Sequence, residues 1–216
     1  MTIKNVTFEK TSTVSVSGGT KDATSYLGGL IGYIISGDAE NTDVTIDNVE
    51  VKGVSTVSIA GVIGNDVPNG KGGYDRKGDV YVGGFAGLVQ GRAKADNKMV
   101  VSHVTLGDVK INIPEEVHKG SRFGGLIGYV NTSCQLNTLS LENSTLSFGD
   151  DITDASYIGG AIGYITGATS YPSSAIALKV TKPAIAINGN VTNTLYLGGL
   201  IGNQKFSTLK ESSVTG

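Results

Sequence analysis

The residues of this chain that could do chemistry are few: two histidines, one cysteine and 19 acidic residues among 216. His103 and His118 lack the His-Glu-x-x-His spacing with which a helix holds zinc. Cys134 follows a polar turn, and no histidine stands near it in sequence to lower its pKa, so we expect an unreactive thiol. We therefore predict no transition-metal site, no cofactor and no enzymatic activity.

Carboxylates are the remaining candidates for catalysis or calcium binding. Calcium needs six to eight oxygen ligands that converge on one point, and the spacing of a calcium-binding EF-hand loop is absent. Glycosidase chemistry needs two carboxylates that face each other, which in a repeat protein would come from neighbouring repeats. We interpret these residues as solvated turns and leave calcium binding open. The clusters are Asp150, Asp151 and Asp154; Asp38 and Glu40; and Asp66, Asp75 and Asp79.

One segment interrupts the regular pattern of the chain and is a candidate for recognition. It lies within 60–79 and contains a dense run of turn-forming residues, which predicts an inserted loop. Loops that protrude from a rigid scaffold often carry binding residues. The candidate binding residues are Tyr74, Asp75, Arg76 and Lys77, an aromatic side chain beside both charges. The alternative is a tolerated insertion without a role.

The elements that must position these residues are indicated by the 32 glycines. Most Gly-Gly pairs lie in one phrase, such as Tyr26-Leu-Gly-Gly-Leu-Ile-Gly-Tyr33, which occurs five times and identifies an internal repeat. A tyrosine commonly precedes the pair by two residues or follows the third glycine, and we expect these rings to lie over glycines of the adjacent repeat. The motif glycines are Gly28, Gly29, Gly32, Gly83, Gly84, Gly87, Gly124, Gly125, Gly128, Gly159, Gly160, Gly163, Gly198, Gly199 and Gly202.

Two further phrases recur before each glycine phrase. An opening phrase such as Ile3–Phe8 and an alternating phrase such as Thr13–Val16 both place apolar residues at strand spacing. The predicted fold is all-β: a right-handed parallel β-solenoid of about five rungs, each with three short strands. A propeller and an antiparallel sandwich are less favoured, because we count three strands per repeat and sandwiches do not explain repeated phrases. The expected units of this single domain are 1–41, 42–98, 99–135, 136–174, 175–207 and a partial unit 208–216.

The repeated Gly-Gly-Leu-Ile-Gly-Tyr phrase, with its preceding aromatic and opening strand, resembles the GLUG repeat. That repeat is associated with bacterial surface and secreted proteins, including repeat regions of IgA-cleaving metallopeptidases and filamentous-haemagglutinin-like adhesins. The resemblance covers essentially the whole chain and implies an extended extracellular β-solenoid without catalysis in the repeats. The sequence departs from the motif where Arg122 replaces the aromatic, Ala86 and Ala161 replace larger residues, and Asn203 replaces the final tyrosine.

The composition of the chain limits the classes of partner that it can bind. A net charge of −2 provides no basic surface for nucleic acid, and no apolar run is long enough to insert into a membrane. We predict a non-enzymatic stalk or adhesion module at the bacterial cell surface or outside the cell, with a host or cell-surface glycan or protein as partner. The alternative is an accessory region of a secreted enzyme, either an IgA-protease-like metallopeptidase or a polysaccharide-acting β-helix. Uncapped ends further suggest neighbouring domains in a longer protein, or end-to-end self-association.

Overall fold

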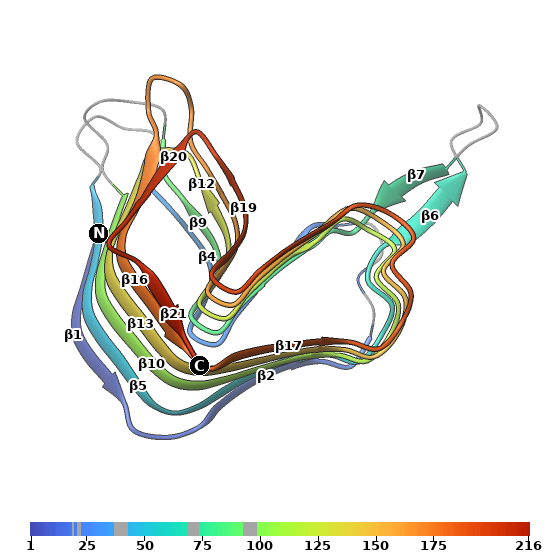
Figure 1. Cartoon of the computed structure of the whole chain (residues 1–216), viewed down its shortest axis with the longest axis horizontal. Helices are drawn as coiled ribbons and strands as arrows, with labels where there is room; N and C mark the ends of the chain where they lie inside the picture. Colours follow the sequence, from blue (N-terminus) through green and yellow to red (C-terminus); the bar gives the residue numbers. More distant parts are fainter. Residues whose placement is uncertain (19, 21–22, 37–42, 69–73, 93–98) are drawn as a thin grey trace.

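A computed structural model of the protein describes residues 1–18, 20, 23–36, 43–68, 74–92 and 99–216. All regular elements in these ranges are strands, and they form a parallel β-solenoid of five turns (Figure 1). This confirms the predicted fold class. Each turn passes through three stacked sheets, which we number 1 to 3 in the order in which the chain enters them.

Sheet 1 is the largest and contains the opening and alternating phrases. Its nine strands pair in parallel from turn to turn. They are β1 (Thr2–Phe8), β2 (Ser12–Val16), β5 (Val44–Ile59), β10 (Met99–Ile113), β13 (Cys134–Phe148), β16 (Ser173–Thr181), β17 (Pro183–Ile187), β20 (Ser207–Lys210) and β21 (Ser213–Thr215).

Sheets 2 and 3 are built from the glycine phrase, which forms two strands and not one. Sheet 2 contains β3 (Ser25–Gly28), β8 (Val80–Gly83), β11 (Arg122–Gly124), β14 (Ser156–Gly159) and β18 (Leu195–Gly198). Sheet 3 contains β4 (Ile31–Ile35), β9 (Ala86–Gln90), β12 (Ile127–Asn131), β15 (Ile162–Thr166) and β19 (Ile201–Lys205). The Gly-Gly pair is therefore the point at which the chain reverses from one sheet into the next.

The first two phrases, conversely, fuse in the middle turns into strands of 15 or 16 residues, β5, β10 and β13. A residue with positive φ interrupts the alternation near the centre of each opening phrase, so the chain bends while the strand continues. Asn48 and His103 have φ values of 56° and 50° at this bend, and Thr138 has 56°. Asparagine tolerates this conformation better than threonine does. Three strands per middle turn are thus present, but their boundaries differ from the three phrases.

The core is a set of apolar ladders inside the solenoid. The parallel register places Ile46 beside Val101 and Val101 beside Leu136, and all three are at most 1% exposed. Each turn buries its apolar face against the next, as the alternating pattern requires. Between sheets 1 and 2, a column of single parallel bridges runs from Thr20 through Ile63 and continues to Val191.

The inserted segment of the second turn forms a two-stranded antiparallel sheet beside the solenoid (Figure 1). Its strands are β6 (Asn65–Pro68) and β7 (Tyr74–Lys77), with Asn65 opposite Lys77 and Pro68 opposite Tyr74. Residues 69–73 between the strands lie outside the described residues. All four predicted binding residues are in β7, and the structure describes only their backbone.

The two ends of the solenoid expose apolar side chains that inner turns cover. Phe8 is 40% exposed at the first turn, where an apolar cavity of about 110 Å³ opens beside it. At the last turn, Leu197 and Phe206 are 53% and 50% exposed. The turns stack along the shortest axis of the molecule, so the five turns form a slab and not a rod (Figure 1). At ~4.8 Å per strand spacing, five turns rise only about 24 Å.

Candidate functional site: a tyrosine stripe around Arg122

The motif glycines bring sheets 2 and 3 into close contact at the reversal. A Cβ atom at Gly128, the third glycine of its phrase, would lie 2.5 Å from the Val82 nitrogen and 2.9 Å from the Arg122 carbonyl oxygen. Such contacts are with backbone and cannot be relieved by a rotamer change. Glycine is therefore needed because one sheet passes directly against the backbone of the other.

The alternation of residues along the strands of sheets 2 and 3 places the tyrosines on the outer surface. Leu27, Val82, Phe123 and Ile158 of sheet 2 point into the core, so the residue before each of them points outward. In sheet 2 this outward row is Tyr26, Tyr81, Arg122, Tyr157 and Tyr196. In sheet 3 the corresponding row is Tyr33, Leu88, Tyr129, Tyr164 and Asn203.

Seven tyrosine rings from the two rows form one continuous series across all five turns. Within a turn, the Tyr26 and Tyr33 rings stack with centroids 4.9 Å apart, and so do the Tyr157 and Tyr164 rings. Between turns, the remaining contacts join neighbouring rings at 4.8–5.4 Å. These pairs are Tyr26–Tyr81, Tyr81–Tyr129, Tyr129–Tyr164 and Tyr157–Tyr196. We call these seven tyrosines, together with Arg122, the tyrosine stripe.

Arg122 lies at the centre of the stripe. Its guanidinium carbon is 4.6 Å from the ring centroid of Tyr81 and 4.5 Å from that of Tyr129. The rings of Tyr157 and Tyr164 lie at 5.3 and 5.5 Å. Four aromatic rings thus surround one cation at distances that favour cation–π attraction. The side chain is 17% exposed, and its Nε and Nη1 atoms are enclosed without a hydrogen-bond acceptor among the described residues.

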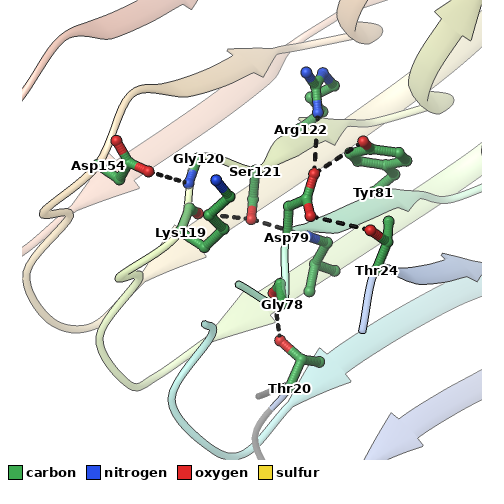
Figure 2. A network of polar contacts seen from close by, with 11 residues as sticks. Thr20, Thr24, Gly78, Asp79, Tyr81, Lys119, Gly120, Ser121, Arg122 and Asp154 are labelled. Carbon is green, nitrogen blue, oxygen red and sulfur yellow. Dashed lines mark hydrogen bonds and ion pairs between the residues drawn. The ribbon is translucent and has the colours of Figure 1, made fainter. Parts of the chain in front are cut away.

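Asp79 is the acidic group next to this cation (Figure 2). Its Oδ2 accepts a hydrogen bond of 3.0 Å from the Tyr81 hydroxyl and lies 3.8 Å from Arg122 Nη1. Its Oδ1 accepts a hydrogen bond of 3.0 Å from the Thr24 hydroxyl. Because 3.8 Å is beyond hydrogen-bond length, Asp79 balances the charge of Arg122 but does not accept a hydrogen bond from its Nη1 atom.

The neighbouring backbone is held by short polar contacts, also visible in Figure 2. Ser121 donates a hydrogen bond to the Lys119 carbonyl oxygen at 2.8 Å and accepts one from the Val80 nitrogen at 3.0 Å. The Gly120 nitrogen donates to Asp154 Oδ2 at 3.0 Å. These bonds tie the second, third and fourth turns together at the entrance to sheet 2, and so fix the start of the strand that carries Arg122.

Three phenols of the stripe, those of Tyr81, Tyr129 and Tyr157, remain protonated at neutral pH. Burial raises the pKa of Tyr81, Tyr129 and Tyr157 above the ordinary value of a phenol, and the nearby charge of Arg122 opposes this only in part. A protonated phenol donates and accepts hydrogen bonds but is a poor nucleophile. The stripe is therefore suited to recognition more than to nucleophilic catalysis.

The sequence-predicted positions are distributed differently from the stripe. The β7 residues Tyr74–Lys77 belong to the separate antiparallel sheet. The expectation that rings lie over glycines is wrong, because the atoms nearest to motif glycines are mainly backbone and the rings stack on one another. The repeat phrase shows the tyrosines but does not by itself show which face of their strand points outward. The buried residue between each tyrosine and the first glycine provides that signal.

The other candidate residues have structural partners. Burial raises the pKa of the Cys134 thiol to about 12, and its sulfur contacts the Asn131 and Thr132 carbonyl oxygens at 3.4 Å. His103 Nδ1 lies 2.8 Å from Asp47 Oδ1, and His118 Nε2 lies 2.9 Å from Glu116 Oε2.

In the acidic cluster at 150–154, carboxylates accept hydrogen bonds from loop backbone. Asp151 Oδ1, for example, accepts from the Asn190 nitrogen at 2.6 Å. Within the described ranges, no group of three His, Cys, Asp or Glu side chains is placed to hold a metal ion. The same ranges contain no helix long and apolar enough to cross a membrane.

Fold and surface together define a parallel β-solenoid that carries an aromatic stripe with one central arginine. Comparison with known proteins adds no relative: no family model, no curated protein and no solved structure matches the chain.

Proposed function

We propose that this chain is a non-enzymatic adhesion module of a bacterial cell-surface or secreted protein. In this proposal the solenoid is a stiff scaffold, and its outer surfaces bind a glycan or a protein on another cell or matrix. The GLUG-like phrase motivates the bacterial and extracellular setting.

The observation that carries the proposal is the continuous tyrosine stripe on the outer surface of the solenoid, whose core is filled by apolar ladders. Exposed aromatic surface is costly in water, and a contiguous patch of it commonly marks an interaction site. Tyr26, Tyr33 and Tyr196 are each 37–42% exposed.

The proposal is tested by adhesion of protein-coated beads to cultured epithelial cells and to bacterial cells under flow. Beads that carry this chain should be retained at least tenfold more than albumin-coated beads, and soluble chain should compete. Equal retention of the two kinds of bead on every surface would contradict the proposal. Release of reducing sugar or of peptides during the assay would favour the alternative, in which the repeat belongs to a secreted enzyme.

We further propose that the apolar side chains exposed on the first and last turns bind another copy of the chain. Phe8 at one end and Leu197 at the other would be covered in such a contact. Sedimentation at rising protein concentration tests the self-association. A purely monomeric chain at all concentrations would exclude it.

A further inference from the structure

We infer that the tyrosine stripe is a binding site for a carboxylated polysaccharide, with Arg122 as the group that recognises the carboxylate. The inference rests on the proposed adhesive function and specifies its ligand and its surface. It has three supports: the chemistry of the rings, the environment of Arg122, and the pairing of the strands beneath them.

The rings and the residues beside them match the two-sided chemistry of a sugar. A pyranose ring has apolar C–H faces and a hydroxyl edge, while a partly exposed tyrosine offers an apolar ring and a hydroxyl. A polar row runs beside the rings on sheet 3, two residues beyond the tyrosine row, and contains Gln90, Asn131 and Thr166. Gln90 Oε1 already accepts a hydrogen bond of 3.1 Å from the Tyr33 hydroxyl. Amides and hydroxyls in this row can both donate to and accept from sugar hydroxyls.

Arg122 makes the site selective for an acidic sugar. A guanidinium has five N–H donors in a planar array that suits a carboxylate. In the part of the chain that the structure describes, Nε and Nη1 have no acceptor, and Asp79 lies 3.8 Å from Nη1. Because Nε and Nη1 are enclosed while the side chain as a whole is 17% exposed, we place the ligand carboxylate at the remaining nitrogen, Nη2. A carboxylate there would be bound in an aromatic, partly dehydrated setting, where charge-assisted hydrogen bonds are strong.

The strands beneath the stripe disfavour an extended peptide as the ligand. A peptide that adds to a sheet needs an unpaired strand edge. In the middle turns both edges are already paired: β11 lies between β8 and β14, and β12 lies between β9 and β15. Only side chains are available at the centre of the stripe, as polysaccharide binding requires.

The test compares two probes with the same backbone. Polygalacturonate carries a carboxylate on each sugar, while fully methyl-esterified polygalacturonate is neutral. Alginate and hyaluronan extend the set of carboxylated chains. We expect the wild-type protein to bind at least one of the three acidic polymers in isothermal titration calorimetry. When that polymer's carboxylates are esterified, its affinity should fall at least tenfold.

The sequence supplies a matched variant, because four of the five turns carry tyrosine where the third carries Arg122. Arg122→Tyr therefore restores the repeat and should keep the thermal midpoint of the wild type. We expect it to lose at least tenfold in affinity for the acidic polymer and to bind acidic and esterified forms alike. Lys110→Gln, a charge change at an exposed residue of β10 on sheet 1, controls for net charge and should bind the acidic polymer with the affinity of the wild type. An additional Tyr157→Ser variant should weaken binding of both forms.

Three results would overturn the inference: no binding to any of the three acidic polymers, equal binding of acidic and esterified chains, or unchanged selectivity in a folded Arg122→Tyr variant. These results are independent of bead retention, which tests the adhesive function itself. Retained beads that do not bind acidic polysaccharide would leave the adhesion module in place and refute only this ligand. Loss of both would refute the proposed function.

Discussion

The second glycine of each motif should be essential where another turn follows and dispensable where none does. At Gly125, in the third turn, an added Cβ atom would collide with the Gly160 carbonyl oxygen of the next turn. It would also lie 2.6 Å from Leu141 Cδ2. At Gly199, the same motif position in the fifth turn, the nearest atom is Val214 Cγ1 at 3.8 Å. The two sites share their local phrase but differ in what lies beyond it.

The expected magnitudes follow from these contacts. Overpacking a core commonly costs about 1–3 kcal/mol, and the cost should lie at the upper end when the obstacle is backbone. We expect Gly125→Ala to lower the free energy of unfolding by about 3 kcal/mol. For a chain of this size, that corresponds to a decrease of roughly 6–12 °C in Tm. Gly199→Ala should be neutral, or stabilising by up to ~1 kcal/mol, because alanine reduces the entropy of the unfolded chain.

Thermal and urea unfolding followed by circular dichroism would measure both variants beside the wild type. Neither glycine has a φ in the left-handed region, so backbone strain does not separate them. Equal destabilisation by the two substitutions would show that the motif needs glycine for its own reversal. The stacking explanation would then be refuted.

Three further predictions concern the bend, the buried thiol and the stripe. Thr138→Asn should raise the free energy of unfolding by about 1 kcal/mol, because Thr138 is exposed at φ 56° and asparagine tolerates that conformation better. The urea midpoint should rise accordingly, and a lower midpoint would count against this explanation. The pKa of Cys134 is about 12 in the fold and 9.0 without it, so its contribution is complete below pH 9 and is lost as pH rises towards 12. Between pH 8 and pH 10 the wild type should therefore lose about 1 kcal/mol more than Cys134→Ala, and equal losses would show that the thiol ionises freely in the native state. In a spectrophotometric titration, the phenols of Tyr81, Tyr129 and Tyr157 should ionise above pH 10; ionisation of these three phenols with the ordinary pKa of tyrosine would contradict the partial burial of their side chains.

The internal repeat made the fold predictable, whereas the strand boundaries depend on backbone conformation and on contacts between sheets. Five copies of one phrase in register required neighbouring copies to stack, which predicts a parallel solenoid whatever the exact strand limits. The fusion of two phrases into β5 and the splitting of the glycine phrase depend on φ at Asn48 and on backbone contacts at Gly128. Neither is visible in apolar periodicity.

The candidate site was harder to foresee for the same reason. Tyr26 and Tyr33 are seven residues apart on different sheets, and only the reversal between them brings their rings to 4.9 Å. The inserted segment breaks the repeat, so the sequence indicates it as a candidate for recognition. The stripe is part of the repeat and differs from it by a single substitution, Arg122.

The substitution of arginine for tyrosine at position 122 is the strongest evidence that the stripe serves recognition. In a stack of equivalent turns, a residue that serves only packing should resemble its neighbours one turn away, and the sheet 2 row is tyrosine at every turn but one. A fifth tyrosine would complete the series of rings. Arg122 instead brings a charge among four rings and leaves Nε and Nη1 without acceptors, which a purely structural role does not need. If Arg122→Tyr keeps the Tm of the wild type while losing the preference for carboxylated chains, Arg122 serves recognition and not stability, as expected for a functional residue in a repeated scaffold.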